Sequence, residues 1–489
     1  MNKNTDIMKS RVIHGFGTLI VREFFLKILS LIGQIFLARL LIPSDFGIYV
    51  IIAFIINLIS LFSDIGLSLA IIQKKDEPSQ SELSGIFWIR ILFSLILILL
   101  IWVFAPFVKV FYPSFIDANI NMLRVFSVIL ILTSLRAIPI SLLERKFKYN
   151  LISLLDVVGV FVYYVVSIGG AVLNFGVWSF IAGAVIKEIV ETVILYIVEP
   201  FFPRLMFSGY KLVKLAKFGI YTQGNGFIMF LIGSITPVIG GTFSGVYSVG
   251  LLDFANNLAY IPGVIAVNFG RVAFAGYSRI QGQKNLLSKS VLSSISMLSI
   301  MLYIFPVIIF SFGSVLVPLV FSEKWVPALP ALYWYSAGVI FYPIITPLGQ
   351  VILSIGKSKE IFWVTSITAI FGWGLSYLFI HTIGFTGIAI ANFFIYFFLF
   401  CFYIYILKLS KFNVLPFVFV SVPKAIVAIA TIILSFIISG LFPDKGIVAI
   451  IIKIAFSTSL YFALLLIFVR KDTLEFVKLL FGWMRSKSL

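Results

Sequence analysis

Charged residues are scarce in this sequence, since Asp, Glu, Lys and Arg together make up 11% of the chain. A soluble domain usually has about 25%. Hydrophobic residues make up 61% of the 489 positions, and the 37 basic residues exceed the 19 acidic ones. This composition excludes a soluble enzyme. The net charge of +18 does not indicate nucleic acid, because the charges lie in short loops between apolar stretches.

Cysteine and histidine are nearly absent. Cys401 is the only cysteine, and it lies within an apolar run, so the chain has no partner for an internal disulfide. His14 and His381 are too few and too far apart in sequence to indicate a histidine metal site. We therefore expect neither a cofactor nor a metal.

What the chain does contain is about fourteen apolar stretches of membrane-spanning length. A bilayer core roughly 30 Å thick needs about 20 apolar residues in a helix, and only helices satisfy the backbone within each stretch. The sequence predicts an all-α polytopic membrane protein. The expected spans are 14–40, 46–72, 85–107, 119–142, 151–173, 176–198, 214–239, 246–270, 290–312, 331–355, 360–380, 386–407, 417–440 and 446–469.

Basic residues crowd every second loop. One set of loops and termini holds 25 Lys and Arg residues, whereas the opposite set holds only Lys109, Lys324 and Lys445. By the positive-inside rule both termini face the cytoplasm. The first helix, which follows the polar stretch 1–12, is expected to be an uncleaved signal anchor.

An internal repeat is indicated by short matches about 200 residues apart. Gly47-Ile48-Tyr49 resembles Gly245-Val246-Tyr247, and Phe16-Gly17 resembles Phe218-Gly219. Six predicted helices separate each pair, so the copies would have parallel topology, as in many transporters. We expect two six-helix lobes, 1–203 and 204–412. Residues 413–489 would add helices 13 and 14 and a basic amphipathic tail on the cytoplasmic surface.

Several charged residues lie inside predicted spans of the first lobe. Arg22, Arg90 and Arg136 each lie about six to eight residues, or roughly 9–12 Å, from the cytoplasmic ends of their helices. Asp64 and Asp156 lie at similar depth. A charge near the bilayer centre costs at least about 2.5–3.5 kcal/mol. The pattern therefore predicts a hydrated cavity suited to an anion such as phosphate.

A structural interpretation of the same charges stays open. Glu23 with Lys27, and Lys187 with Glu191, have the spacing of intrahelical ion pairs. The three arginines could equally pair with Asp64 or Asp156. In the second lobe Asp253, with Asn256 and Asn257 one turn on, is the clearest candidate for a polar site.

The stretch 37–49, Leu-Ala-Arg-Leu-Leu-Ile-Pro-Ser-Asp-Phe-Gly-Ile-Tyr, resembles the first-loop signature of bacterial polysaccharide-unit flippases. These form the Wzx-like branch of the multidrug/oligosaccharidyl-lipid/polysaccharide exporter superfamily. The basic loop 143–149 and the stretches 277–282 and 321–325 are similar to that family as well. The resemblance covers nearly the whole chain.

This resemblance implies a flippase with two six-helix lobes that works by alternating access in the bacterial inner membrane. Its cargo would be a polyprenyl-diphosphate-linked oligosaccharide, moved to the outer leaflet for surface polysaccharide synthesis alongside other glycan-assembly membrane proteins. Combined with the charges inside the spans, this cargo leads us to predict two groups of site residues. Arg22, Arg90, Arg136 and Lys27 would hold the diphosphate, and Asp64, Asp156 and Asp253 would orient them or couple transport to Na⁺ or H⁺. Relatives often carry an acidic residue late in the seventh helix, where this chain reads Ser-Ile-Thr-Pro-Val at 234–238, which weakens an ion site there.

Three other functions remain open at this point. A drug or cation antiporter of the same superfamily would need an acidic, aromatic-lined site, and the arginine excess argues against it. A membrane glycosyltransferase or polymerase would need a long outward catalytic loop, which the short outward loops do not provide. A non-transporting scaffold would leave the charges inside the membrane unexplained.

Overall fold

The computed structural model describes residues 23, 25–63, 71, 76–205, 226–439, 446–476 and 478. Helices dominate, and no strand occurs in these ranges. Contacts divide the chain into two compact units, Met1–Gly250 and Leu251–Leu489. The predicted lobe boundary near residue 203 stays a prediction, because residues 206–225 lie outside the described ranges.

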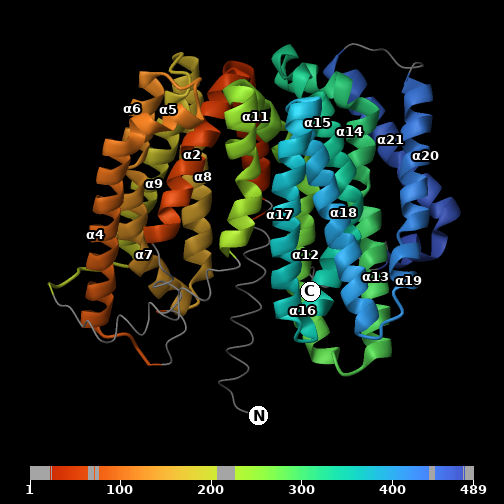
Figure 1. Ribbon diagram of the computed structural model, residues 1–489. Helices are drawn as coiled ribbons and strands as arrows, with labels where there is room; N and C mark the ends of the chain where they lie inside the picture. The colour runs from red at the N-terminus through yellow and green to blue at the C-terminus, as the bar shows by residue number, and fades with distance from the viewer. Residues whose placement is uncertain are drawn as a thin grey trace. The chain divides into compact units, whose positions relative to one another are not determined.

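The first unit is a bundle of long helices (Figure 1). Residues 25–40 form its first described helix. The following elements are α2 (Pro43–Ser63), α4 (Gln80–Phe104), η1 (Ala105–Phe107), α5 (Val108–Phe111), α6 (Asp117–Phe126), α7 (Ile129–Arg145), α8 (Tyr149–Val172), α9 (Trp178–Val198), η2 (Thr236–Gly240) and the start of α11 (Gly241–Ala259). Helix α8 packs along α9, and α7 contacts both α4 and α9. Helix α7 therefore packs against helices that precede it and follow it in the sequence.

A capping box in the sequence marks the start of helix α4. Ser79 is the N-cap, and the backbone N–H of Glu82 donates to its hydroxyl at 3.4 Å. The Glu82 carboxylate in turn accepts from the backbone N–H of Ser79 at 2.9 Å. This reciprocal capping box satisfies two backbone donors that the first turn leaves open, so it fixes where α4 starts.

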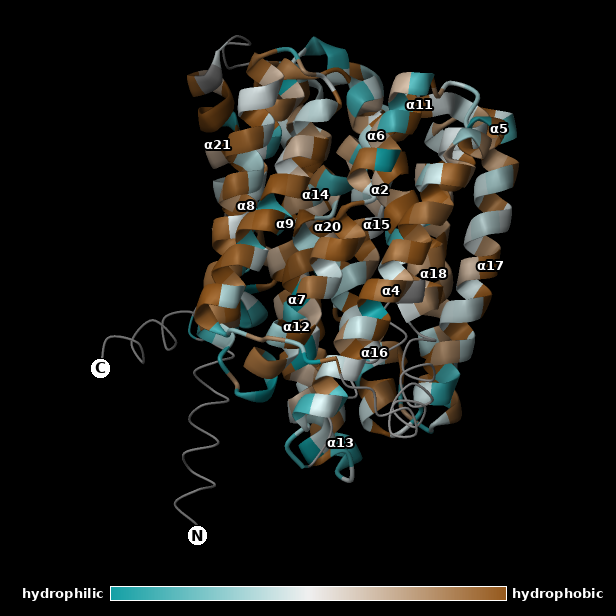
Figure 2. Ribbon diagram, turned by 90° about the vertical axis from the view of Figure 1, so that its left-hand side faces the viewer, coloured by the Kyte–Doolittle hydropathy of each residue, from teal (hydrophilic) through white to brown (hydrophobic). Residues whose placement is uncertain are grey.

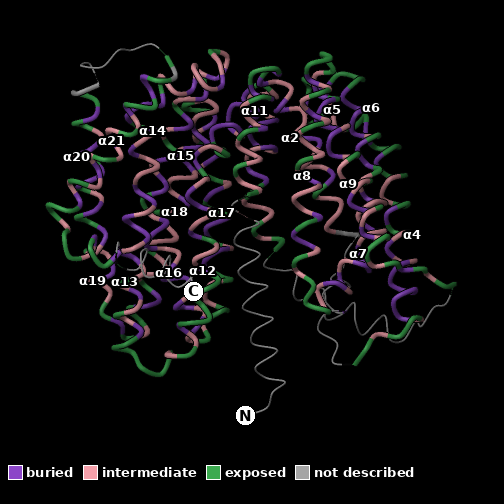
Figure 3. The backbone as a smooth tube through the Cα atoms, turned by 180° about the vertical axis from the view of Figure 1, so that it is seen from behind, coloured by how far each residue is buried: buried purple, intermediate pink, exposed green. Residues whose placement is uncertain are grey.

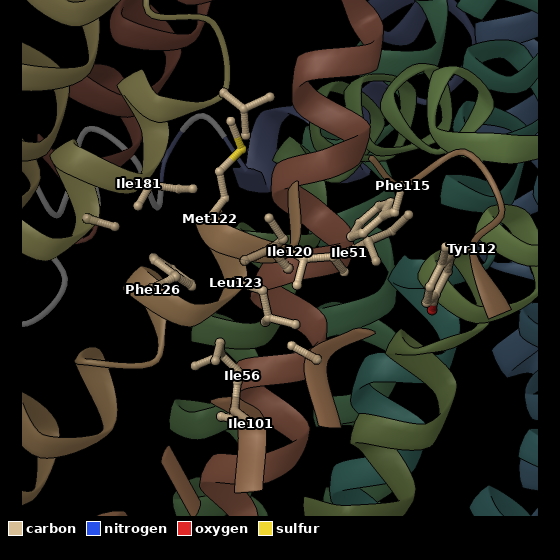
Figure 4. Packing of buried hydrophobic residues seen from close by; sticks show 14 of the residues in the cluster. Ile51, Ile56, Ile101, Tyr112, Phe115, Ile120, Met122, Leu123, Phe126 and Ile181 are labelled. Atoms are coloured by element: carbon tan, nitrogen blue, oxygen red, sulfur yellow. The ribbon is translucent and has the colours of Figure 1, made fainter. Parts of the chain in front are cut away.

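The core of the first unit is apolar and lies where α2, α6 and α9 meet. Ile51, Leu123, Phe126 and Ile181 are buried there together with Tyr112. Figure 4 shows these side chains converging from separate helices. Burial of large aliphatic and aromatic groups removes voids between the helices, and this packing fixes α9 against α2 and α6.

The second unit contains the remaining helices. They are α12 (Ile261–Ile280), α13 (Lys284–Leu302), α14 (Ile304–Leu316), η3 (Val317–Phe321), η4 (Glu323–Ala328), α15 (Leu329–Gly338), η5 (Val339–Phe341), α16 (Tyr342–Ser354), α17 (Ser358–Ile383), α18 (Thr386–Leu409), α19 (Leu415–Phe419), α20 (Val422–Ser439) and α21 (Ile447–Phe468). Helix α17 packs along α18, and α14 contacts α20 and α21.

Several predicted spans are broken helices. The span 246–270 extends to Ile280 and breaks at Tyr260, just before Pro262. The span 331–355 is interrupted by η5, after which α16 begins with Pro343 near its start. Proline lacks a backbone N–H and restricts the preceding turn, so each break coincides with a place where the helical hydrogen-bond ladder is interrupted.

Hydrophobic residues predominate along the helices (Figure 2), and Figure 3 marks the exposed positions, many of which carry large hydrophobic side chains. On α20 the exposed residues Ile426, Ile429, Ile433 and Phe436 recur at helical spacing and form one stripe. Eleven helices in the described ranges are long and apolar enough to cross a membrane. Helix α9 has similar length but carries Lys187, Glu188 and Glu191. The prediction of an all-α polytopic membrane protein is confirmed, and the predicted count of fourteen is compatible with this structure.

Candidate functional site

Arg136 lies at the centre of a charged cluster in the first unit. Its Nη1 contacts Oε2 of Glu188 and Oε2 of Glu191, so helix α7 is tied to α9 by two ion pairs. The side chains are 15%, 13% and 2% exposed respectively. At this burial a guanidinium needs charge partners to offset its lost hydration.

The structure shows two partners of Arg136 that the sequence did not suggest. The structural interpretation of the sequence named Asp64 or Asp156, and the structure adds Glu188 and Glu191, while Asp64 lies outside the described residues. The reason is geometric. Both glutamates lie three residues apart on the α9 face that packs against α7, which puts two carboxylates within reach of one guanidinium.

Lys187 adds a second positive charge to the cluster, beside the two glutamates. Its Nζ lies 3.5 Å from Oε1 of Glu188 and 3.8 Å from Oε1 of Glu191. The i, i+4 pair of Lys187 and Glu191 predicted from spacing is therefore confirmed. Lys187 is 30% exposed at its side chain, so it is less enclosed than the two glutamates.

Helix α8 makes room for one of these carboxylates through a glycine. A Cβ built on Gly159 would lie 1.6 Å from Oε1 of Glu191, a distance that no real side chain tolerates. Glu191 therefore packs directly on the α8 backbone. Asp156, one turn before Gly159, lies close enough for its charge to act on Glu191. Three helices, α7, α8 and α9, thus contribute charged groups to one cluster.

Arg90 lies on α4, which also packs against α7. It is 5% exposed. One turn further along α4, the Ser94 hydroxyl lies 2.6 Å from the Ser134 hydroxyl of α7 and donates to the Leu130 carbonyl at 3.0 Å. These buried bonds fix α4 against α7. The predicted residues Arg90 and Arg136 are therefore on adjacent, bonded helices.

The remaining predicted residues have mixed outcomes. Arg22 and Asp64 lie outside the described residues. Lys27 is partly buried in the helix 25–40, and the charge of Glu23 acts on it, as the spacing of the two predicts.

Asp253 belongs to α11 and to the second unit. Its Oδ2 accepts a hydrogen bond of 2.9 Å from Nδ2 of Asn257, one turn on. The polar pair suggested by the sequence is thus present in the structure.

The basic loop between α7 and α8 has a structural role that spacing did not reveal. Lys146 forms an ion pair with Glu199, and Nζ of Lys148 lies 3.4 Å from the same carboxylate. Burial alone would raise the pKa of Glu199, but the hydrogen bonds and positive charges of Lys146 and Lys148 outweigh it and lower that pKa below its usual value. The loop is therefore fastened to the end of α9.

The arrangement constrains what the cluster can bind. The cluster holds two positive groups, Arg136 and Lys187, and three negative ones, Glu188, Glu191 and Asp156, so its negative groups outnumber its positive groups by one. Nη1 of Arg136 already contacts two carboxylates, Glu188 and Glu191, so an anion would compete with them at this atom. Within the described ranges, His, Cys, Asp and Glu side chains form no group of three suited to a metal ion.

Taken together, a helical bundle with apolar outer surfaces and a charged cluster inside one unit defines a polytopic membrane protein of the transporter type. A family model described as "Polysaccharide biosynthesis protein" matches residues 36–330. The chain belongs to this family.

Two curated relatives are similar over about two thirds of this chain. The succinoglycan biosynthesis transport protein ExoT of Rhizobium meliloti is 22% identical over 68% of this chain and 67% of its own length. The teichuronic acid biosynthesis protein TuaB of Bacillus subtilis is 21% identical over 64% of this chain and 65% of its own length. The aligned part therefore spans about two thirds of each relative.

The fold is also that of a solved flippase. The structure of the lipid II flippase MurJ in an inward closed conformation superposes with a TM-score of 0.76 at 18% identity, over 92% of this chain and 98% of that one. The match establishes a shared fold.

Proposed function

We propose that this protein is a flippase that moves a polyprenyl-diphosphate-linked oligosaccharide from the cytoplasmic to the outer leaflet by alternating access. The observation that carries the proposal is the charged cluster around Arg136, which is buried between helices of the first unit. Ionisable groups at such a place are costly to insert, and in membrane proteins they mark substrate or ion pathways. Family membership and the names of the relatives support the same function.

The diphosphate would contact the arginines of the first unit. In the empty state Glu188 and Glu191 hold Arg136 in place, a role that the sequence assigned to Asp64 and Asp156. The incoming diphosphate replaces these carboxylates as the counter-charge, because phosphate oxygens accept bidentate bonds from guanidinium. Arg22, Arg90 and Lys27 are proposed to complete the anion site. Asp64 and Asp156 are proposed to orient it.

The polyprenyl chain needs an apolar surface. A groove of about 700 Å³ lies in the second unit between α14, η5, α18 and α20, with Phe310, Phe341, Phe400 and Ile429 among its lining side chains. An isoprenoid chain matches such a lining, since it has no polar atoms to satisfy. We infer that helix 13 of the predicted topology, seen here as α20, helps to hold the lipid tail.

No covalent chemistry is required for this function, and we propose that the protein is not an enzyme. The driving force is proposed to be a Na⁺ or H⁺ gradient or downstream consumption of the product, with Asp253 and Asn257 as the ion-coupling pair of the second unit. We place the protein in the inner membrane of a bacterium with both termini in the cytoplasm. Other glycan-assembly membrane proteins are its expected partners.

The decisive experiment deletes the gene in its host and follows the lipid-linked intermediate. A flippase predicts that the intermediate accumulates in the cytoplasmic leaflet and that surface glycan is lost, with both restored by the wild-type gene. A drug antiporter predicts normal glycan and a loss of cationic dye efflux instead. Normal glycan with no accumulated intermediate contradicts the proposed function.

A further inference from the structure

A second charged site lies in the second unit. Its residues belong to other helices than those of the cluster around Arg136 and lie more than 90 positions further along the sequence. A cleft of about 410 Å³ opens between α13, the end of α19 and the segment that follows α21. Lys289 and Lys471 line it together with Ser293. Lys289 lies in the second turn of α13, and Lys471 follows the last residue of α21, Phe468, by three positions. The cleft therefore lies at the level where these spans leave the membrane.

One wall of the cleft is an ion pair that the sequence did not reveal. Lys424 is 2% exposed at its side chain, contacts Oδ2 of Asp472, and donates to the Val420 carbonyl at 2.8 Å. The Ser296 hydroxyl donates to the same Asp472 oxygen at 2.8 Å. Burial opposes ionisation of Asp472, but the bonds from Lys424 and Ser296 prevail and lower its pKa. Asp472 is thus ionised and its charge is compensated.

Because Lys424 compensates the charge of Asp472, the net charge around the cleft is positive. Lys424 itself does not line the cleft. Of the lining residues other than Asp472, Lys289 and Lys471 are positive and only Glu475 is negative. Ser293 is exposed and offers a hydroxyl donor beside the two surface lysines. Ammonium and hydroxyl donors of this kind bind phosphate oxygens. The polar part of the cleft therefore favours a phosphate group.

The rest of the lining is apolar. Leu292, Met297 and Phe476 face the cleft alongside the polar groups. A free phosphate gains nothing from such walls, whereas a lipid places its phosphate near the surface and its acyl chains against apolar side chains. Cationic pockets between helices at the membrane surface are typical sites for anionic lipid headgroups.

We propose that this cleft binds the phosphate headgroup of an anionic phospholipid, with Lys289 and Lys471 as its main contacts. Bound lipid would join α13 to the segment after α21, in addition to the tie that Lys424, Asp472 and Ser296 already make. The site is independent of the transported cargo, so it stands or falls separately from the proposed flippase activity.

The test uses the purified full-length protein and native mass spectrometry with phosphatidylglycerol, phosphatidylcholine or inorganic phosphate. We expect phosphatidylglycerol to bind at least about tenfold more tightly than phosphatidylcholine, and the K289Q/K471Q variant to lose that preference. The control variant K359Q/K408Q removes two other exposed lysines of the second unit and should retain it.

The outcomes separate clearly. Equal binding of the two lipids, or equal loss of preference in both double variants, overturns the proposal. Competition by millimolar inorganic phosphate that displaces the lipid completely also overturns it, because the apolar walls would then contribute nothing. If K289Q/K471Q is not monodisperse, the K289R/K471R variant keeps both charges and must retain the preference.

Discussion

Gly47 of α2 lies directly against the Val246 carbonyl of α11, since a Cβ added to Gly47 would come within 1.7 Å of that oxygen. The contact is reciprocal, because a Cβ on Gly250 would come within 1.8 Å of the Pro43 carbonyl. Each helix thus offers a carbonyl and, four residues on, a glycine. Such small-residue crossings allow backbones in membranes to approach closely. The two triplets matched as a repeat in the sequence therefore contact each other.

Replacement of Gly47 by alanine should disrupt this crossing. The obstructing atom is backbone, which adjusts less readily than a side chain, so we expect a loss of about 1–3 kcal/mol in stability. Thermal unfolding of the purified protein in detergent measures it. Gly374→Ala on α17 is the matched control, because nothing lies within 4 Å of a Cβ at that position. An equal effect of both substitutions would show that the crossing is not close.

The packing of Glu191 on Gly159 predicts a coupled pair of mutations. Gly159→Ala alone should be destabilising, since its methyl group would meet the Glu191 carboxylate. Glu191→Asp shortens the side chain and withdraws the carboxylate from α8. In the double variant the two effects should therefore be less than additive, by about 1 kcal/mol. Unfolding free energies for the four proteins of the cycle check this, and strict additivity would contradict the contact.

The role of Arg136 can be separated into binding and packing. Arg136→Gln leaves Glu188 and Glu191 without their guanidinium partner and should cost about 3–5 kcal/mol in stability. Adding Glu191→Gln removes one of the orphaned charges and should restore much of that loss.

Transport by the double variant then decides between the two roles. If Arg136 contacts the diphosphate, R136Q/E191Q should remain inactive in cells although its membrane level is normal. Surface glycan measures transport, and an immunoblot measures the membrane level. Wild-type glycan in that variant would assign Arg136 a purely structural function. A Glu191→Gln single variant serves as the control for the loss of the carboxylate.

The tie between Glu199 and the α7–α8 loop predicts a pH dependence. The folded state lowers the pKa of Glu199 below its ordinary 4.5, because Lys146 and Lys148 stabilise its anion. The contribution to stability is therefore complete above the ordinary pKa and is lost as pH falls through the lowered value. Both lysines are half-exposed, so the contribution should be about 0.5–1 kcal/mol.

Glu199→Gln tests this prediction directly. The variant should be less stable than the wild-type protein at about pH 7, and the difference should shrink once the pH falls below the ordinary glutamate pKa of 4.5 and vanish below the lowered pKa. Thermal unfolding in detergent across this range provides the measurement. A difference that grows toward acid pH would have the wrong sign for a stabilised carboxylate.

The proposed orientation predicts the location of two loops. Reporter fusions after Lys148 and after Lys445 should report the cytoplasm and the exterior respectively, because 25 basic residues lie on the first side and 3 on the other. Alkaline phosphatase and green fluorescent protein fusions give opposite signals and control for expression. The reverse pattern would invert the topology.

Sequence reasoning was accurate where the relevant contact is local. The predicted spans 151–173, 360–380 and 446–469 correspond closely to α8, α17 and α21. The pairs Lys187–Glu191 and Asp253–Asn257 follow from one helical turn. It was less accurate where prolines interrupt a span, since a hydropathy pattern continues through a break such as the one at Tyr260.

The sequence by itself determined that this chain crosses the membrane many times, because apolar length and backbone hydrogen bonding leave no alternative to helices in lipid. Only the tertiary structure decided which charges meet. Arg136 finds Glu188 and Glu191 across 52 and 55 positions, and Lys424 finds Asp472 across 48. Such partners depend on which helix faces pack together. The role of Gly159, which leaves room for the Glu191 carboxylate, likewise depends on the packing of α8 against α9.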